Sequence, residues 1–151
     1  MKTAEQLVNL TKGWEVVSVS PNATLKEAIQ LMVDHNIGSV LVKEGEEIVG
    51  IWTERDLVLH ALSPDFNIET SLVKKCMETD LVKAQLDEDI YRLMDKFLGK
   101  RVRHILVENK GKFVGLLSLG DVIKYNLNEK TKELESINSV VNWDYYENWH
   151  W

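Results

Sequence analysis

Apolar residues recur along the chain in two patterns, one typical of short strands and the other of amphipathic helices. Short β-branched stretches at 15–19 and 81–84 predict strands. Each is followed by apolar residues at i, i+3, i+4 and i+7, which predict a helix. These stripes are Leu25, Ala28, Ile29 and Met32, and then Ile90, Leu93, Met94 and Phe97. Thr24 with Glu27 three residues later predicts a capping box that starts the first of these helices.

A strand pair and a short helix are expected after each stripe. The segments GSVLV and EIVGIW flank a turn at 44–47, and HILV and KFVGLL flank a turn at 109–112. Partly apolar segments at 54–62 and 119–127 predict the closing helices. We expect residues 128–141 to extend the last helix, anchored by Leu134, Ile137 and Val141.

The two halves of this pattern are copies of one unit. A shift of 65 residues aligns 3–62 with 68–127 without a gap, with nine identical pairs. The chain is therefore predicted to be an α/β protein with mixed sheets, in two tandem strand-helix-strand-strand-helix units. One such unit has too few strands to bury both faces of its sheet, so the copies should pack together. The predicted boundaries are 1–66 and 67–127 for the units, and 128–151 for the tail.

Composition narrows the function classes. The 151 residues include 44% apolar ones, and the net charge of −6 argues against general binding to nucleic acids. A lone cysteine, Cys76, and four scattered histidines show no metal-ligand spacing. The longest apolar runs fall far short of the roughly 18 residues that span a membrane. The first residues lack the apolar stretch of a secretory signal, so a cytoplasmic location is expected.

Candidate chemistry lies at two junctions between a strand and a helix. Residues 50–56 and 115–121 share the form Gly-x-x-(Ser/Thr)-x-x-Asp. A helix start with a hydroxyl can hold a phosphate, and a carboxylate one turn later can accept both hydroxyls of a ribose. Glycine would let a flat ring or another part of the chain approach closely. The same spacing is that of an ordinary capping box, and both explanations stay open.

A basic segment distinguishes the two copies. Residues 96–104, KFLGKRVRH, carry four positive charges and no acid. On a strand, Arg101 and Arg103 would share one face while Val102 and His104 share the other. The aligned residues of the first copy, at 36–39, are uncharged, which predicts unequal phosphate affinity. A solvated, solubilising loop is the alternative.

The chain resembles the paired CBS domains, or Bateman modules. The resemblance lies in the repeated motifs GIWTERD and GLLSLGD, the segments VSVSPNATLKEAIQLM and RVRHILV, and the VKKCM connector. The resemblance covers residues 3–127 and extends to small stand-alone bacterial and archaeal members. It implies two units packed about a pseudo-two-fold axis, with two clefts between them. It also implies an adenine nucleotide as regulatory ligand, of the AMP, ATP or NADH class, and a homodimer formed through helices.

The resemblance assigns residues to both clefts. In the first, Asp56 would hold the ribose and Thr53 a phosphate oxygen, with Arg103 and His104 neutralising the phosphate and Val82 lining the adenine pocket. In the second, Ser118 and Asp121 would take these roles, with Val17, Ile37 and Gly38 as the wall. Arg55 is expected to reach a phosphate or to pair with Glu54, and Trp52 to stack on an adenine or obstruct it.

These observations favour a non-catalytic sensor that binds an adenosine nucleotide and signals to another protein. The alternative is a ligand-free scaffold for dimerisation, in which the motifs only cap helices. An enzyme is not expected, because no nucleophile has a spaced base and no phosphate loop of the Walker type occurs. The aromatic tail is predicted to pack on a dimer partner through Trp143, Tyr145, Tyr146, Trp149 and Trp151.

Overall fold

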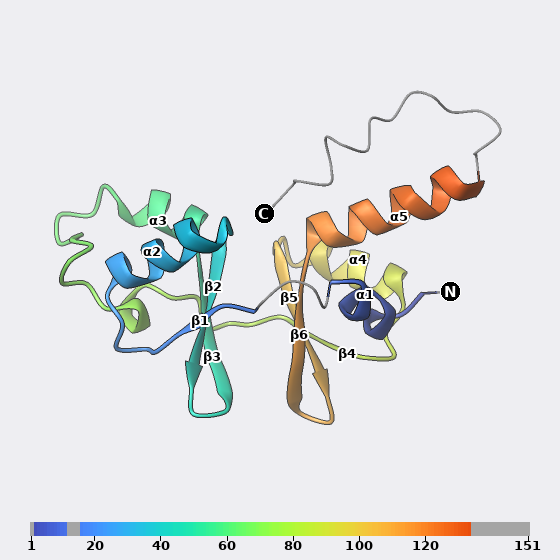
Figure 1. The fold of residues 1–151 in the computed structure, drawn as a ribbon, viewed down its shortest axis with the longest axis horizontal. Helices are drawn as coiled ribbons and strands as arrows, with labels where there is room; N and C mark the ends of the chain where they lie inside the picture. Colours follow the sequence, from blue (N-terminus) through green and yellow to red (C-terminus); the bar gives the residue numbers. More distant parts are fainter. Residues whose placement is uncertain (1, 12–15, 134–151) are drawn as a thin grey trace. The chain divides into compact units, whose positions relative to one another are not determined.

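The computed structural model describes residues 2–11 and 16–133, and within these the chain forms two compact units. The first-repeat unit comprises the described residues of 15–81, and the second-repeat unit those of 1–14 and 82–151. Figure 1 shows the elements of both units. The predicted tail anchors, from Leu134 onward, lie outside the described residues. No helix in the described ranges is long and apolar enough to cross a membrane.

The first-repeat unit is a three-stranded sheet with helices. Its elements are β1 (Ser18–Val19), α2 (Leu25–His35), β2 (Ser39–Glu44), β3 (Glu47–Thr53), α3 (Glu54–His60) and the 3-10 helix η1 (Val73–Lys75). The strand order is β1-β2-β3, with β1 parallel and β3 antiparallel to β2. Figure 1 shows α2 and α3 on the same side of this sheet. The predicted order of elements is confirmed, although β1 is shorter than the sequence pattern suggested.

The second-repeat unit has the same sheet. Its elements are α1 (Ala4–Leu10), β4 (Lys83–Gln85), α4 (Ile90–Gly99), β5 (His104–Asn109), β6 (Lys112–Ser118) and α5 (Leu119–Glu133). The order β4-β5-β6, with one parallel and one antiparallel pairing, repeats that of the first unit. The fold is therefore a mixed α+β arrangement of two tandem repeats, and α5 does continue beyond residue 127 as expected.

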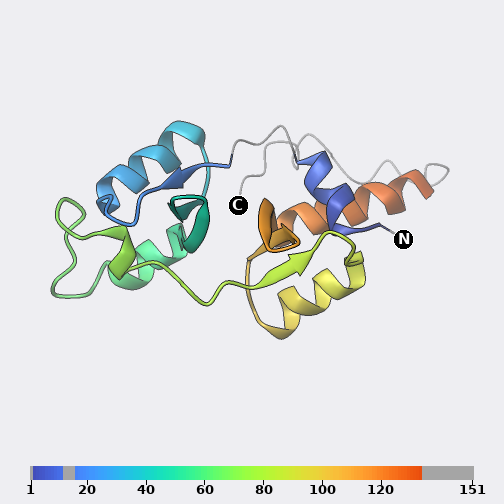
Figure 2. The same ribbon diagram turned by 90° about the horizontal axis from the view of Figure 1, so that it is seen from below.

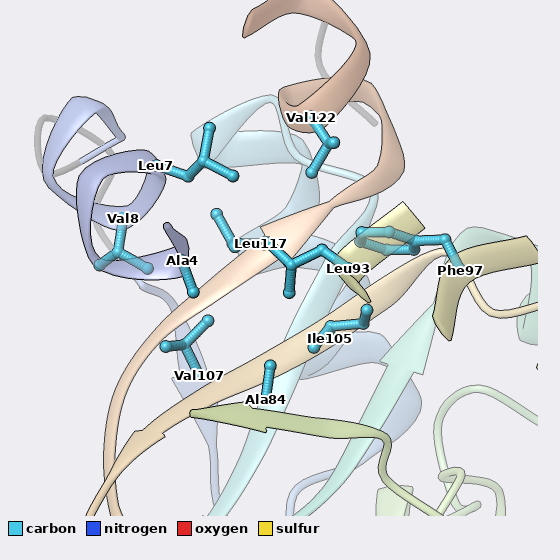
Figure 3. Packing of buried hydrophobic residues seen from close by; sticks show 10 residues of the cluster. All are labelled: Ala4, Leu7, Val8, Ala84, Leu93, Phe97, Ile105, Val107, Leu117 and Val122. Carbon is cyan, nitrogen blue, oxygen red and sulfur yellow. The ribbon is translucent and has the colours of Figure 1, made fainter. Parts of the chain in front are cut away.

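Each sheet buries its apolar core on the face that carries the helices. In the first-repeat unit, Val40, Val42 and Trp52 pack against Leu25 and other residues of α2. In the second-repeat unit, Leu93 and Phe97 of α4 meet the sheet residues, as Figure 3 shows. The predicted helical stripes are the buried ones, with Ile29, Ile90 and Met94 only partly buried at their margins.

The core of each unit also includes a short helix from outside its own repeat: α1, which precedes the first repeat, packs in the second-repeat unit, and η1, which precedes the second repeat, packs in the first-repeat unit. Helix α1 buries Leu7 and Val8 in the core of the second-repeat unit and lies beside α5 (Figures 2 and 3). The amide of Ala4 donates to the carbonyl of Glu88 at 2.8 Å. Likewise, η1 buries Val73 in the first-repeat unit. The compact units therefore do not follow the sequence boundaries at 66 and 67, because residues 68–77 pack with the repeat they follow.

Two motif glycines are required by this packing. A Cβ on Gly50 would lie 2.4 Å from the Sδ of Met77, and one on Gly115 would lie 2.7 Å from a methyl group of Val8. Side chains of the chain itself therefore occupy the space that the sequence analysis left open to a ligand ring. The two glycines are explained by the close approach of η1 and α1 segments.

Candidate functional site

The first candidate junction joins β3 to α3. The hydroxyl of Thr53 donates to Oδ2 of Asp56 at 3.0 Å, and the Asp56 amide donates back to the hydroxyl at 3.3 Å. The Thr53 amide also donates to Oδ2, at 2.9 Å. The Glu54 amide donates to the carbonyl of Gly38 at 2.9 Å, which ties the end of α2 to the start of α3.

The second junction, between β6 and α5, repeats this network with shorter distances. The amide and hydroxyl of Ser118 donate to Oδ2 of Asp121 at 2.8 and 2.7 Å, and the Asp121 amide donates to the hydroxyl at 3.0 Å. The Leu119 amide donates to the carbonyl of Arg103 at 3.0 Å. Arg103 thus takes the place that Gly38 has in the first repeat.

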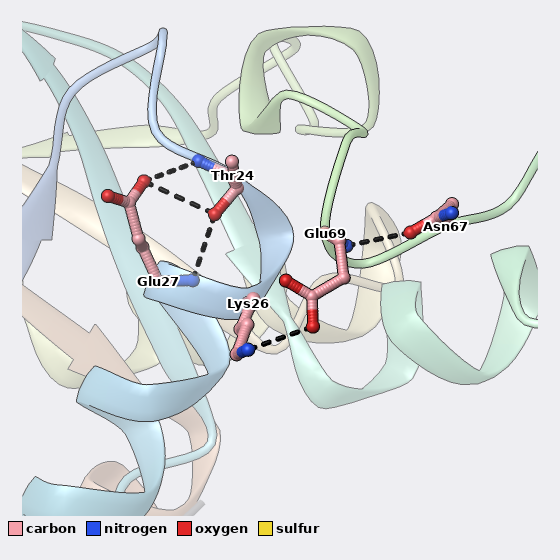
Figure 4. Close-up of polar contacts among 5 residues, drawn as sticks. All are labelled: Thr24, Lys26, Glu27, Asn67 and Glu69. Atoms are coloured by element: carbon pink, nitrogen blue, oxygen red, sulfur yellow. Dashed lines mark hydrogen bonds and ion pairs between the residues drawn. The ribbon is translucent and has the colours of Figure 1, made fainter.

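The hydrogen bonds at both junctions are those of a capping box, as the sequence spacing predicted. Helix α2 begins with the same arrangement, in which Thr24 and Glu27 exchange the same three bonds at 2.7 to 3.2 Å (Figure 4). The box of α2 is exposed, and a loop precedes it, whereas a strand leads directly into each of the two junctions. The box by itself is therefore no evidence for a ligand, and any argument for one rests on what the box leaves available.

What the boxes leave available favours a sugar over a phosphate. The hydroxyl proton and most amides of the first turn are already donated, as described above for Thr53, Glu54 and Asp56. A phosphate would therefore find little of the backbone donor set that a bare helix start offers. Among the described residues, the side-chain hydrogen bonds of Asp56 and Asp121 use Oδ2, which leaves Oδ1 with its lone pairs to accept hydroxyl groups.

The structure groups the other predicted residues by their own repeat. Beside the first junction, Ile37 adjoins Gly38 and packs on the core, and the carbonyl of Val17 accepts from the amide of Leu41 at 3.0 Å. In the second-repeat unit, Val82 makes the equivalent bond to Leu106 at 2.9 Å.

His104 lies beside the second junction, because it is paired with Ser118 across strands β5 and β6. Arg103 precedes it at the start of β5. The predicted clefts combine each of these sets with the junction of the opposite repeat, and that combination stays a prediction. Within a repeat, Val17, Ile37 and Gly38 accompany Asp56, whereas Val82, Arg103 and His104 accompany Asp121.

The basic segment does not form a strand, so the predicted alternation of its faces is wrong. Strand β5 begins only at His104, and Arg101 has a left-handed backbone with φ of 53°. The aligned Asn36 has φ of 51° and ends α2 in the same way. Asparagine tolerates this conformation, whereas for arginine it costs roughly 1–2 kcal/mol. Lys96 is engaged by Glu88 at 2.7 Å, but Arg101 and Arg103 are exposed.

Two residues near the first junction have structural roles. Trp52 is fully buried in the core, so the expectation that it stacks on or obstructs an adenine is wrong. Burial and the nearby Asp56 carboxylate raise the pKa of the Cys76 thiol, which keeps it protonated at neutral pH. Arg55 is exposed on α3, next to Glu54. Within the described ranges, no three His, Cys, Asp or Glu residues gather to hold a metal ion.

Comparison with known proteins identifies the family motif in both repeats. The model of the CBS domain matches residues 10–63 and 73–128. A 17.7 kDa protein of Acidianus ambivalens is 33% identical over 79% of this chain and 72% of its own length. A Methanopyrus kandleri protein is 30% identical, and this chain covers only 57% of it. The solved CBS-domain protein ATU1752 of Agrobacterium tumefaciens is 32% identical, with a TM-score of 0.76 over 83% of this chain and 99% of its own.

Two more distant solved structures contain ligands. CBSX2 was solved in complex with AMP and has a TM-score of 0.69 at 19% identity, covering 86% of this chain and 99% of its own. The CBS domain pair of MJ0100 was solved with 5′-methylthioadenosine and S-adenosyl-L-methionine, with a TM-score of 0.66 at 18% identity over 76% and 90% of the chains. At these identities, the likeness establishes a shared fold alone.

Proposed function

The chain belongs to the CBS-domain family, and we propose that it is a non-catalytic regulatory module that binds an adenosine-containing ligand at its strand-to-helix junctions. The observation that carries this proposal is that Asp56 and Asp121 are each held through Oδ2 at the start of a helix, while no residue in the described part of the chain donates to Oδ1. A carboxylate fixed in this way is suited to accept the two hydroxyls of a ribose. AMP, ATP and NADH are the ligand class proposed.

The ligands of related folds support the same class. CBSX2 with AMP and the MJ0100 pair with S-adenosyl-L-methionine share an adenosine group, and that group contains the ribose that a carboxylate can hold. Binding would regulate a partner only if the ligand binds one conformation of the module more tightly than another. We propose that the partner is another protein, in the cytoplasm, and that the chain catalyses no reaction of its own.

Isothermal titration of the full chain with adenosine, AMP, ATP and NADH tests the proposal. We expect saturable binding of at least one of these ligands, and a rise in the melting temperature when that ligand is in excess. A ligand present at 100 times its dissociation constant stabilises the folded state by about 2.7 kcal/mol. The absence of heat and of any thermal shift with all four would favour the ligand-free scaffold instead.

We further propose that the chain forms a homodimer through α3. No residue of this seven-residue helix is fully buried, and only Leu57 packs partly on the core. Val58 and Leu59, and Leu62 just after the helix, are 72%, 65% and 94% exposed. An isolated helix this short is unstable in water, so contact with a second copy would supply the missing packing. Val122 of α5, which aligns with Leu57, is fully buried, whereas Leu57 is only partly buried.

A charge on this face should separate the copies. We expect Leu59→Glu to change the mass measured by light scattering from twice 17.4 kDa to 17.4 kDa, because an uncompensated carboxylate cannot be buried cheaply. Leu98→Glu is the matched control, since Leu98 is 65% exposed on α4. An unchanged dimer in Leu59→Glu, or a monomeric parent protein, would contradict the assignment to α3.

A further inference from the structure

In the first repeat, the segment that follows the closing helix α3 returns to cover the start of α2. The amide of Lys26 donates to the carbonyl of Ile68 at 2.9 Å. Its Nζ forms an ion pair with the carboxylate of Glu69 at 2.8 Å (Figure 4). Phe66 and Ile68 of the same segment are partly buried against the first-repeat core. The cover of α2 is therefore both apolar and acidic.

The aligned helix α4 lacks such a cover among the described residues. Tyr91, which aligns with Lys26, is 73% exposed, and Leu98 is 65% exposed. Together with the partly buried Met94, these two residues form the α4 stripe, at positions i, i+3 and i+7 on one side of the helix. The closing helix α5 continues to Glu133, so within the described part of the chain no segment returns from it to α4.

The N-terminal segment replaces only one part of the cover. The amide of Ile90 donates to the carbonyl of Lys2 at 3.0 Å. The aligned amide of Leu25 donates to the carbonyl of Ser71 at 2.9 Å, so Lys2 takes the place of Ser71. The contacts that residues 66–69 make in the first repeat have no equivalent among the described residues of the second-repeat unit.

The segment that follows α5 has the composition to supply this missing cover. Residues 134–151 contain three acidic residues, neither lysine nor arginine, and five aromatic residues among the last nine. Beside the α4 stripe, the cations Arg92, Lys100 and Arg101 are exposed. They outnumber the one acid of α4, Asp95. The segment and this face of α4 are therefore complementary in charge as well as in apolar character.

The segment is also long enough to return to α4. Helix α5 has 15 residues, which makes it about 22 Å long. The ten residues 134–143 span up to about 33 Å when extended, so they can run back along the whole of α5. Helices α4 and α5 share one core, in which Leu93 and Phe97 lie with Val122 (Figure 3).

We propose that the aromatic and acidic segment 143–149 docks on α4 of its own second-repeat unit. Its aromatic rings cover the α4 stripe, and its carboxylates meet Arg92 and Lys100. The sequence alone favoured packing of this segment on a dimer partner. The contact is instead intramolecular, because the tether through α5 gives the segment a high effective concentration at α4. Helix α3 is left uncovered for the second copy.

Limited proteolysis of the full chain with chymotrypsin tests this docking. The protease cuts after aromatic residues, and intact-mass measurement identifies cuts within 143–149. The test variants are Tyr91→Glu and Leu98→Glu, which place a carboxylate in the α4 stripe, where an acidic segment would bury it unpaired. Val33→Glu is the matched control, because Val33 aligns with Leu98 and is 68% exposed on α2. None of these changes alters the sequence of the cleaved segment.

We expect both α4 variants to be cut within 143–149 about tenfold faster than the parent chain, because cleavage follows the population of the undocked segment. Val33→Glu should be cut there at the parent rate. Cleavage elsewhere should be unchanged in all three variants, which shows that they remain folded, since each replaced side chain is exposed. The measurement uses no nucleotide, so its outcome is independent of the proposed function.

Equal cleavage of the parent and both α4 variants would overturn the inference, as would an equal acceleration in Val33→Glu. Dilution separates the intramolecular contact from a contact with a second copy. Protection of 143–149 in the parent chain should persist when the protein is diluted about a hundredfold, because a tethered contact does not depend on protein concentration. Protection that is lost on dilution would place the segment on a second copy and overturn docking on its own unit.

Discussion

Trp52→Ala should lower the free energy of unfolding of the first-repeat unit by about 3–5 kcal/mol, measured by urea denaturation. The indole is fully buried, and it packs among Val40, Val42 and the residues of α2. Removing it leaves a cavity that a small unit with a single sheet can fill only in part. A loss below about 1 kcal/mol would contradict its place in the core.

Trp52→Phe is the informative companion variant. The indole N–H has no hydrogen-bond partner among the described residues, and a buried unpaired donor costs about 1–3 kcal/mol. Phenylalanine removes this donor while keeping much of the ring, so its effect on stability should be much smaller than that of alanine. Ligand affinity should not change, and a loss of affinity at unchanged stability would place the ring against the ligand after all.

Alanine at either junction aspartate should weaken ligand binding at that junction by ten- to a hundredfold. Hydrogen bonds to a charged group contribute about 1.5–3 kcal/mol, and each 1.4 kcal/mol is a factor of ten in affinity. The loss is measured by titration calorimetry of Asp56→Ala and Asp121→Ala with the ligands that bind the parent chain. Each variant also loses its capping box, at a cost of about 1 kcal/mol in stability.

Glu27→Ala separates these two effects. Glu27 has the same three-bond box with Thr24 at the start of α2, with no candidate ligand site there. It should lower stability by a similar amount and leave ligand affinity unchanged. If Asp56→Ala and Asp121→Ala behave like Glu27→Ala, the motifs are helix caps and the scaffold explanation holds.

Most of the fold follows from the spacing of apolar residues. The stripe from Leu25 to Met32 and its copy from Ile90 to Phe97 each form the buried face of a helix. Because the second half of the chain repeats the same pattern, its sheet has the same strand order. Periodicity succeeds here because burial of one face decides where each element lies.

Helix α1 is the element that the sequence analysis missed. Thr3 and Gln6 form a capping box, and Leu7 and Val8 align with Leu72 and Val73 of the connector. The box and the alignment together could have indicated a short helix. The pattern could not have shown which sheet this helix covers, because apolar spacing indicates that a side chain is buried and not what it is buried against.

The candidate site was only partly predictable for the same reason. The Gly-x-x-(Ser/Thr)-x-x-Asp spacing correctly placed both capping hydroxyls and carboxylates at strand-to-helix junctions. It did not show that Met77 fills the space above Gly50, or that Trp52 points into the core. The HILV segment correctly placed the start of β5, but the alternation of faces expected for residues 101–104 was wrong, because Arg101 has a left-handed backbone and lies outside the strand.

The most direct measurement is a crystal structure of the full chain grown with ATP in large excess. We predict density for the nucleotide at a strand-to-helix junction, with a ribose hydroxyl within hydrogen-bond distance of Oδ1 of Asp56 or Asp121. A structure in which both junctions hold only their own capping bonds, or in which ATP lies elsewhere, would contradict the central claim.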